Sequence, residues 1–277
     1  MRKVLCAILL SGMFAGAASA EVVGVLAKMN ASPKEYQKFI ADRQSKRLRK
    51  AISSRDDNVS CRFYASMTAM FMALNAGKID TMFLPECTAD YILMENEMTE
   101  ARGFVSAKGL TGLTMGFRAE DADLRDDVNS ALSEMAKDGI SSLLIKRHIS
   151  GPDANNPKPV KFEKFKGAKI VNVAITGDLP PIDYVDAEGN AAGFNTALLA
   201  ELGRRLHVNI QLVHIEAGAR SAALISGRAD CVFWFALSQG GGHQWDIPDG
   251  IIVTAPYFSW DKNWFIGISK KPPTSVL

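Results

Sequence analysis

Candidate ligand-binding side chains fall in two loops of the second half of the sequence. The first loop is GDLPPIDY (177–184), where the prolines restrict the backbone and Asp178 and Tyr184 offer a carboxylate and an aromatic ring. Tyr184 lies either against a ligand or in the core of the fold. The second loop, WFALSQGGG, offers Trp234 and Ser238, and its glycines permit close approach of a ligand to the backbone. Both loops suit recognition of a small molecule.

Arg220 and the pair Asn30 and Ser32 stand where helices are predicted to begin. The guanidinium of Arg220, at the start of ARSAALISG, can hold a carboxylate with two parallel hydrogen bonds or form a surface salt bridge. Asn30 and Ser32 precede a predicted helix whose free backbone N–H groups could hold an anion. Ser32 could also serve only to cap that helix, without touching a ligand.

Glu86 and Thr88 follow the predicted strand IDTMFL (79–84). Glu86 could receive an ammonium group, and Thr88 could either cap the next helix or touch the ligand. In open α/β sheets, ligands bind beyond the carboxyl ends of the strands, which is where these residues are expected.

No pattern of residues indicates a metal site or a catalytic centre. The sequence contains no CxxC, no HExxH and no cluster of histidines, so we expect no metal and no cofactor. Glu86, His214 and His243 are the candidates for acid or base chemistry, and none belongs to a recognisable constellation. We therefore predict no catalytic residue and a protein that is not an enzyme.

The elements that must position these residues alternate between strand and helix. Strands are predicted at VVGVLAK, VSCRFYA, IDTMFL and GLTMGFR in the first half and at KIVNVAIT, VNIQLVHI and DCVFWF in the second half. Helices are predicted between them, including one from Asp121 to Gly139 and one capped by Asn195. This alternation predicts an α/β fold with mostly parallel sheets.

An internal repeat suggests two lobes built on one plan. ALNAGKIDTMF (73–83) aligns without gaps to ALISGRADCVF (223–233), at a spacing of 150 residues. In both segments a leucine ends the core face of a helix, a glycine ends the helix and an aspartate opens a buried strand. Residues 150–168 hold three prolines and read as a linker.

The N-terminus has the features of a secretory signal peptide. Arg2 and Lys3 precede a short apolar run and then AASA, which predicts cleavage after Ala20 and no stable membrane insertion afterwards. Removing both charges leaves 30 basic against 30 acidic residues, which gives no indication of nucleic-acid binding. Cys61 and Cys87 either form a disulfide in the oxidising periplasm or remain thiols.

The joint pattern of these segments resembles the periplasmic solute-binding proteins of the polar amino-acid type, extracellular solute-binding family 3. VAITGDLPPIDYVDAEGNAAGFNTALLAELGRRL, ALISGRAD and VTAPYF resemble the first lobe of that family. ALNAGKIDTMFLPECTADY and GLTMGFRAEDADLRDDVNSALSEMAKDGISSLL resemble its second lobe and its return segment. The resemblance implies a two-lobed periplasmic-binding-protein-like fold with hinge strands.

The order of the lobes is reversed relative to the family, which predicts a circular permutation. The alternative is two truncated modules that pair between chains. The predicted organisation is a signal peptide at 1–20, lobe B at 21–110 completed by 262–270, crossover and return helices at 111–149, the linker at 150–168, lobe A at 169–261 and a tail at 271–277. The hinge is expected at the crossovers near 111–120 and 257–262.

The resemblance also implies function. It predicts a monomeric periplasmic protein that captures a small polar or zwitterionic solute, amino-acid-like or an organic acid, by lobe closure and delivers it to the permease of an ABC transporter. A sensor for a membrane receptor and a cyclohexadienyl-dehydratase-like enzyme are the alternatives. Two departures stand out: family members carry Thr-x-x-Arg after the strand matching CVFWF, and often an aspartate where Pro85 stands.

Overall fold

A computed structural model of the chain describes residues 21–26, 59–106, 110–151, 158–186, 188–238, 246–259 and 264–271. The strands in these residues are β1 (Glu21–Leu26), β2 (Val59–Tyr64), β3 (Thr81–Pro85), β4 (Thr99–Ser106), β5 (Leu110–Arg118), β6 (Ile170–Ile175), β7 (Asp178–Leu179), β8 (Asp183–Val185), β9 (Ala191–Ala192), β10 (Asn209–His214), β11 (Cys231–Ser238), β12 (Ile251–Val253) and β13 (Trp264–Lys270). The α-helices are α3 (Met67–Asn75), α4 (Glu86–Glu95), α5 (Ala122–Lys137), α6 (Ile140–His148), α7 (Gly193–Leu206) and α8 (Arg220–Ile225), with the short 3-10 helices η2 (Ala119–Asp121) and η3 (Ala217–Ala219).

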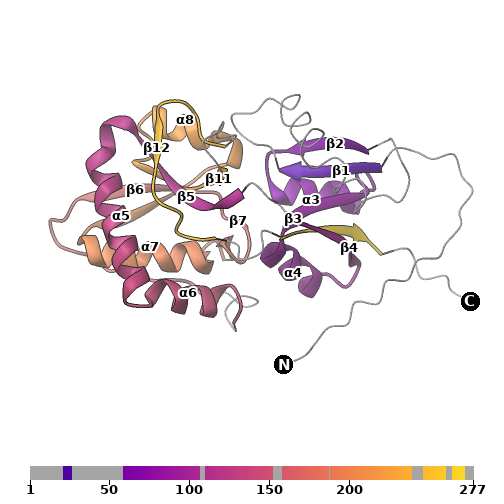
Figure 1. Cartoon of the computed structure of the whole chain (residues 1–277), viewed down its shortest axis with the longest axis horizontal. Coiled ribbons are helices and arrows are strands. Elements are labelled where there is room, and N and C mark those ends of the chain that lie inside the picture. Colours follow the sequence, from indigo (N-terminus) through magenta and orange to yellow (C-terminus); the bar gives the residue numbers. More distant parts are fainter. Residues whose placement is uncertain are drawn as a thin grey trace, which may run out of the picture.

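Lobe B is a five-stranded sheet in the order β2-β1-β3-β13-β4, with α3 and α4 packed against it (Figure 1). β1 pairs in parallel with β2 and β3, whereas β13 runs antiparallel to β3 and β4. The core between the helices and the sheet is apolar and closed, and it contains Met70, Leu74, Ile79, Met82, Leu84, Ile92 and Ile268.

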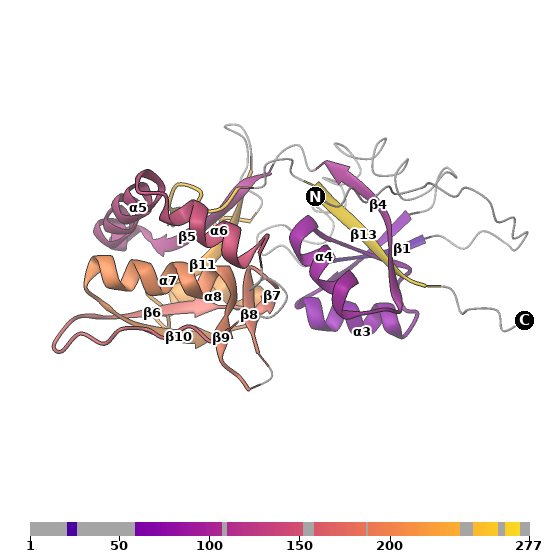
Figure 2. The ribbon, with the colours of Figure 1, turned by 90° about the horizontal axis from the view of Figure 1, so that it is seen from below.

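Lobe A is a second five-stranded sheet, in the order β10-β6-β11-β5-β12, with helices on both faces. Figure 2 shows α5, α6 and α7 together in this lobe. In β6 the side chains of Val171 and Val173 pack toward α5 and α7, while Ala174 packs toward α8, as the two-residue period of a strand requires. A small sheet, β7-β8-β9, lies at the end of the lobe that faces lobe B.

The two lobes share one plan. In both sheets the strand order is second, first, third, an antiparallel strand and then a further strand. β1 pairs with β3 at Val23 and Thr81, and β6 pairs with β11 at Val173 and Cys231, positions that are 150 residues apart in both strands. The α/β prediction is therefore confirmed, and the spacing of the sequence repeat extends to strand pairing. The prediction of mostly parallel sheets is wrong, because each five-stranded sheet has two parallel and two antiparallel pairings.

The repeated helix ends have the same geometry in both lobes. Gly77 and Gly227, which follow α3 and α8, adopt left-handed backbone angles with φ of 68° and 69°. Beyond each glycine, an aspartate carboxylate accepts a hydrogen bond from the first strand: Asp80 from Val22 N at 2.8 Å and Asp230 from Asn172 N at 2.7 Å. The pattern read from the sequence thus reflects one recurring helix-to-strand turn.

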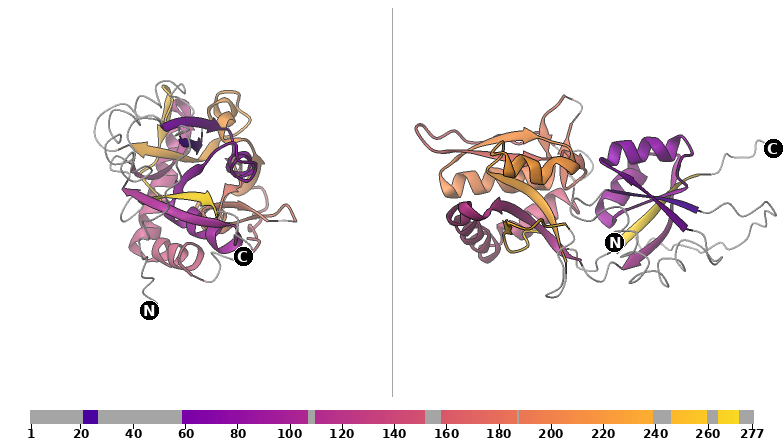
Figure 3. Two further views of the ribbon diagram at one scale, coloured as in Figure 1. Left: turned by 90° about the vertical axis from the view of Figure 1, so that its right-hand side faces the viewer. Right: turned by 90° about the horizontal axis from the view of Figure 1, so that it is seen from above.

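Each lobe receives one strand from the other half of the chain. β5 follows the strands of lobe B in sequence but pairs with β11 and β12 in lobe A. β13 follows lobe A and pairs with β3 and β4 in lobe B, which the views from the end and from above also show (Figure 3). The predicted crossover at 111–120 is wrong, because these residues pair as strand β5 inside lobe A and continue into η2.

Several local predictions need correction. Asn195 does not cap α7: the helix begins at Gly193, and its early N–H groups bond to the loop before it, Phe194 N to Pro181 O at 3.1 Å and Asn195 N to Ile182 O at 2.8 Å. Because backbone carbonyls satisfy these donors, no side-chain cap is needed. Strand β4 and the small β7-β8-β9 sheet were not predicted. Residues 158–168 form no helix or strand, as expected of the linker.

Candidate functional site

The loop GDLPPIDY is a rigid hairpin that presents two side chains together. Asp178 in β7 and Tyr184 in β8 are directly paired across the hairpin, so their side chains project from the same face. Asp183, which is buried, fixes the base of the loop by accepting hydrogen bonds from the backbone N–H and the hydroxyl of Thr176, both at 2.9 Å. The bonds from the N-terminus of α7 hold the other side of the loop.

The hairpin contacts lobe B at the N-terminus of α3. Asp178 Oδ2 accepts a hydrogen bond from Met67 N, the first residue of α3, at 3.0 Å. Ser66 caps the same helix, because its hydroxyl accepts from Ala69 N at 3.1 Å. The free N–H groups of a helix N-terminus carry partial positive charge, which favours the Asp178 carboxylate at this position.

A second contact between the lobes joins two tyrosines. The Tyr91 hydroxyl, from α4 of lobe B, donates a hydrogen bond to the Tyr184 hydroxyl at 3.1 Å. The ring centroids lie 5.7 Å apart at an angle of 64°, an edge-on contact. Burial, followed by the bond to Tyr184, raises the pKa of Tyr91, so this hydroxyl keeps its proton and can donate. Asp178, Tyr184, Met67 N and Tyr91 form what we call the interlobe site.

Carboxylates at and near the interlobe site are disposed to hold protons or cations. Burial raises the pKa of Asp178, and the neighbouring Asp183 carboxylate adds to this effect, although the bond from Met67 N opposes it. Burial also raises the pKa of Asp90 on α4, with a further contribution from Glu86. A cationic group next to Asp178 would stabilise its charged form.

Trp234 is buried beneath the loop, so its ring is not open to stacking by a ligand. The residue is 7% exposed, and its Nε1 donates a hydrogen bond to the Thr176 hydroxyl at 3.0 Å. Because the same hydroxyl donates to Asp183, the three side chains form one chain of hydrogen bonds beneath the hairpin. Trp234 thus helps to position GDLPPIDY through its bond to Thr176.

Arg220 is placed differently from the prediction. Its side chain is 1% exposed, and it pairs with the buried Asp246 through Nη2 and Oδ1 at 3.0 Å. Neither a surface salt bridge nor an open clamp for a ligand describes this arrangement. The physical reason is that the segment containing Asp246 folds over the guanidinium and supplies its counter-ion.

Two further predicted residues, Glu86 and Thr88, have no contact with the residues of the interlobe site among the bonds that the structure describes. Glu86 is the exposed first residue of α4, the helix that carries Tyr91. Thr88 is fully buried within α4, and Pro85 occupies the N-cap position, so capping by Thr88 is wrong. Ser238 is the last residue of β11, and its side chain lies outside the part of the chain that the structure describes. Asn30, Ser32 and the side chain of Cys61 lie outside the described residues, which leaves a Cys61–Cys87 bond a prediction.

Tyr91 and Met67 N were missed by sequence reasoning. Tyr91 belongs to a predicted helix, but no local pattern shows which residue of another lobe will meet its hydroxyl. Met67 contributes through its backbone, and only the cap Ser66 marked its position in the sequence. The sequence feature that could have indicated this contact is the start of a capped helix directly after a strand.

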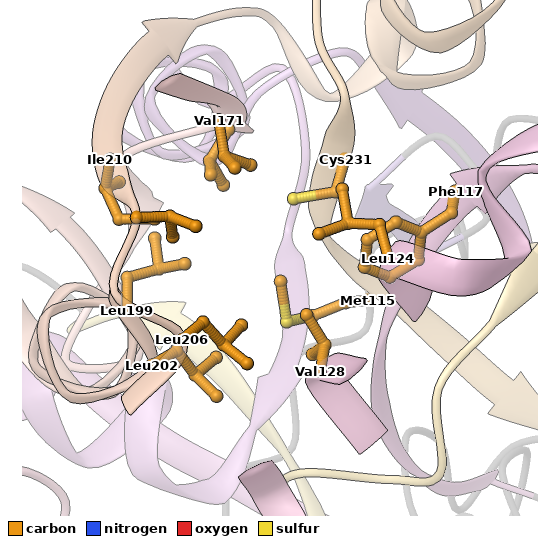
Figure 4. A pocket seen from close by; sticks show the side chains of 12 residues that line it. Met115, Phe117, Leu124, Val128, Val171, Leu199, Leu202, Leu206, Ile210 and Cys231 are labelled. Atoms are coloured by element: carbon orange, nitrogen blue, oxygen red, sulfur yellow. The ribbon is translucent and has the colours of Figure 1, made fainter. Parts of the chain in front are cut away.

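The cavity drawn in Figure 4 lies inside lobe A, away from the interlobe site. Its volume is about 20 Å³, and apolar side chains from the sheet and from α5 and α7 surround it. It is lined by Met115, Phe117, Leu124, Val128, Val171, Val173, Leu199, Leu202, Leu206, Val208, Ile210 and Cys231. Such a space accommodates about one water-sized molecule and has no polar group to hold a solute.

Within the described ranges, no group of three or more His, Cys, Asp or Glu side chains is arranged to hold a metal ion. The helices in these ranges also include none with the length and apolar character needed to span a bilayer.

Comparison with solved structures finds ligand-binding proteins of low sequence identity. The ligand-binding component of an ABC-type import system from Staphylococcus aureus is 11% identical, with a TM-score of 0.46 over 91% of this chain and 66% of that one. The periplasmic aliphatic sulphonate binding protein of Escherichia coli is 12% identical, with a TM-score of 0.38 over 92% of this chain and 66% of that one. The chain thus spans slightly less than two thirds of these two proteins.

The alkanesulfonate-binding protein of Xanthomonas axonopodis pv. citri is 10% identical, with a TM-score of 0.42 over 93% of this chain and 67% of that one. A search of curated protein sequences finds no match to this chain.

The family comparison matches a continuous part of lobe A. Residues 171–236 match the model of the bacterial extracellular solute-binding proteins, family 3. The matched segment runs from β6 to β11 and includes the hairpin with Asp178 and Tyr184. This part of lobe A is therefore similar to the bacterial extracellular solute-binding proteins, family 3.

Proposed function

We propose that this protein is a periplasmic solute-binding protein that captures a small polar or zwitterionic solute at the interlobe site and delivers it to the permease of an ABC transporter. The family match over residues 171–236 supports a solute-binding role. The pair of contacts that Asp178 and Tyr184 make with lobe B supports the proposed position of the solute. A solute next to these residues would touch both lobes at once, and contacts available only in the closed form stabilise closure.

The chemistry of the interlobe site suits a solute with a positively charged or hydrogen-bonding group. Asp178 provides a carboxylate, and Tyr184 and Tyr91 provide two hydroxyls and two aromatic rings. A cation can bind through the carboxylate and through the face of an aromatic ring. We propose no catalytic step, and the protein acts by binding alone.

Titration calorimetry with a panel of small amines, amino acids and organic acids tests this function. For a compound that binds, Tyr184→Ala should weaken the affinity at least tenfold, while Tyr184→Phe, which keeps the ring, should weaken it less. Asp249→Ala, at an exposed residue, serves as the control. Thermal unfolding of each variant reports whether the fold is intact. Unchanged affinity in both Tyr184→Ala and Asp178→Asn would discard the interlobe site.

We also propose that the chain is a circularly permuted, monomeric member of the family, with lobes assembled from discontinuous segments. The exchange of β5 and β13 between the sheets supports this organisation. A rearranged gene that places residues 169–271 before residues 21–151 should give a protein with the same ligand affinity. Light scattering should give the mass of one chain. The mass of two chains would instead support modules that pair between molecules.

A further inference from the structure

The ion pair of Arg220 and Asp246 has the geometry of a bound carboxylate. Nη2 lies 3.0 Å from Asp246 Oδ1 and Nη1 lies 3.3 Å from Oδ2, so the guanidinium donates to both oxygens. Ala236 N donates a third hydrogen bond to Oδ2 at 2.7 Å. The side chains of Arg220 and Asp246 are 1% and 2% exposed. A two-pronged guanidinium with a backbone N–H is the usual donor set for a carboxylate.

The guanidinium is held in place by groups other than Asp246. Nε donates to Ala217 O at 3.0 Å and Nη1 donates to Trp234 O at 2.6 Å. The guanidinium carbon stacks 3.8 Å from the centre of the Trp234 ring and lies 5.0 Å from that of Phe235. These partners belong to the 3-10 helix η3 and to strand β11, and the carboxylate comes from a third segment that contains Asp246.

A buried guanidinium requires an anion. Removing one partner of a buried ion pair leaves an uncompensated charge, which strongly destabilises the fold. In this chain Asp246, which follows β11 in the sequence, supplies that anion next to Ala236 of β11.

We propose that Arg220 and Ala236 N–H form a carboxylate receptor that the chain fills with its own Asp246, as a tethered ligand. As a second step, which rests on the proposed function, Arg220 is already paired with Asp246 and does not clamp a carboxylate of the solute. The solute class is then a small polar amine without a carboxylate, recognised by Asp178 and the two tyrosines of the interlobe site.

Chemical rescue tests the receptor. Asp246→Ala should unfold at a lower temperature than the wild type, and formate or acetate should restore the loss in a saturable way. At ten times the dissociation constant the midpoint should rise by about 4 °C. Chloride at equal ionic strength should not do so. Neither the wild type nor the matched control Asp249→Ala should respond to formate, since each keeps Asp246.

A second variant makes the rescue specific. Asp246→Ala combined with Arg220→Leu removes the guanidinium and should lose the response to formate. If Asp246→Ala does not fold when expressed, refolding from urea with formate or with chloride provides the readout, and formate should raise the soluble yield. Absence of any formate effect in the unfolding and refolding measurements overturns the receptor.

Calorimetry on the wild type tests the solute class separately. Each α-amino acid is compared with the amine that lacks its carboxylate, and the amine should bind at least tenfold more tightly. Tighter binding of the amino acids overturns the solute class but leaves the binding function. If no compound binds, the proposed function fails while a positive formate rescue still establishes the receptor.

Discussion

The Tyr91 hydroxyl donates a hydrogen bond to the Tyr184 hydroxyl at 3.1 Å, and the two residues come from different lobes. Tyr184 is held by the hairpin of lobe A and Tyr91 by α4 of lobe B, so the bond reports the relation of the two lobes. Together with the bond from Met67 N to Asp178, it holds the hairpin against the start of α3 and the middle of α4.

Removing these hydroxyls should reveal the coupling between the lobes. Tyr91→Phe, Tyr184→Phe and the double variant delete the bond while keeping both rings. A double-mutant cycle from urea unfolding should give a coupling free energy of about 0.5–1.5 kcal/mol. Tyr91→Phe combined with Asp249→Ala should be additive. A coupling of zero between the tyrosines would show that they are not bonded in solution.

Asp178 should make stability depend on pH. Burial raises its folded pKa above the ordinary value of 3.8, so its proton is held more tightly in the folded state than in the unfolded state. The stabilisation is fully present below the unfolded pKa and is lost as pH rises through the folded pKa. Asp178→Asn retains an acceptor for Met67 N but does not titrate.

The difference in unfolding free energy between Asp178→Asn and the wild type should therefore shift in favour of the variant as pH rises above about 4. Urea unfolding at a series of pH values measures this. Asp249→Asn, at an exposed position in the same lobe, should follow the wild-type profile. Parallel profiles for Asp178→Asn and the wild type would contradict the assigned burial.

The two helix-ending glycines should contribute equally to stability. Gly77 and Gly227 have φ of 68° and 69°, and a Cβ added at either would meet no atom within 4 Å. Alanine at each position therefore carries only the backbone cost of the left-handed conformation, about 1–2 kcal/mol. Gly218→Ala, where φ is not positive and the space is also open, is the control and should cost little. Urea unfolding of the three variants makes the comparison.

The two repeated aspartates should differ in their contribution. Asp80 accepts from Val22 N, whereas Asp230 accepts from Asn172 N and Nδ2 and lies 3.6 Å from Arg118. Asp80→Ala should lower the unfolding free energy by about 1 kcal/mol, and Asp230→Ala should lower it by more. Equal losses in urea unfolding would show that only the bond to the first strand matters.

Local chemistry explains which features could be predicted from the sequence. The turns at Gly77 and Gly227 were predictable, because each is a left-handed helix cap between an apolar helix and a buried strand. The conformation of such a turn depends only on residues that are close in the sequence. The hairpin at Asp178 was located by its prolines and its position after a strand. Each of these features is set within about ten residues.

Features that depend on distant segments could not be predicted. Asn195 is a good capping residue, but the carbonyls of Pro181 and Ile182 already occupy the helix N-terminus. Arg220 has the chemistry of a ligand clamp, but Asp246, 26 residues further on, neutralises it. The meeting of Tyr91 with Tyr184, 93 residues apart, requires both lobes to be assembled.

The exchange of strands also bears on synthesis by the ribosome. The strands of lobe A, including β5 and β12, have all been translated before residue 264 emerges, whereas the lobe B sheet lacks its antiparallel strand until β13 is made. Until β13 is made, the edges of β3 and β4 with which it pairs lack its hydrogen bonds. Unpaired strand edges favour aggregation. A nascent chain thus completes lobe A first, although most of lobe B is translated earlier.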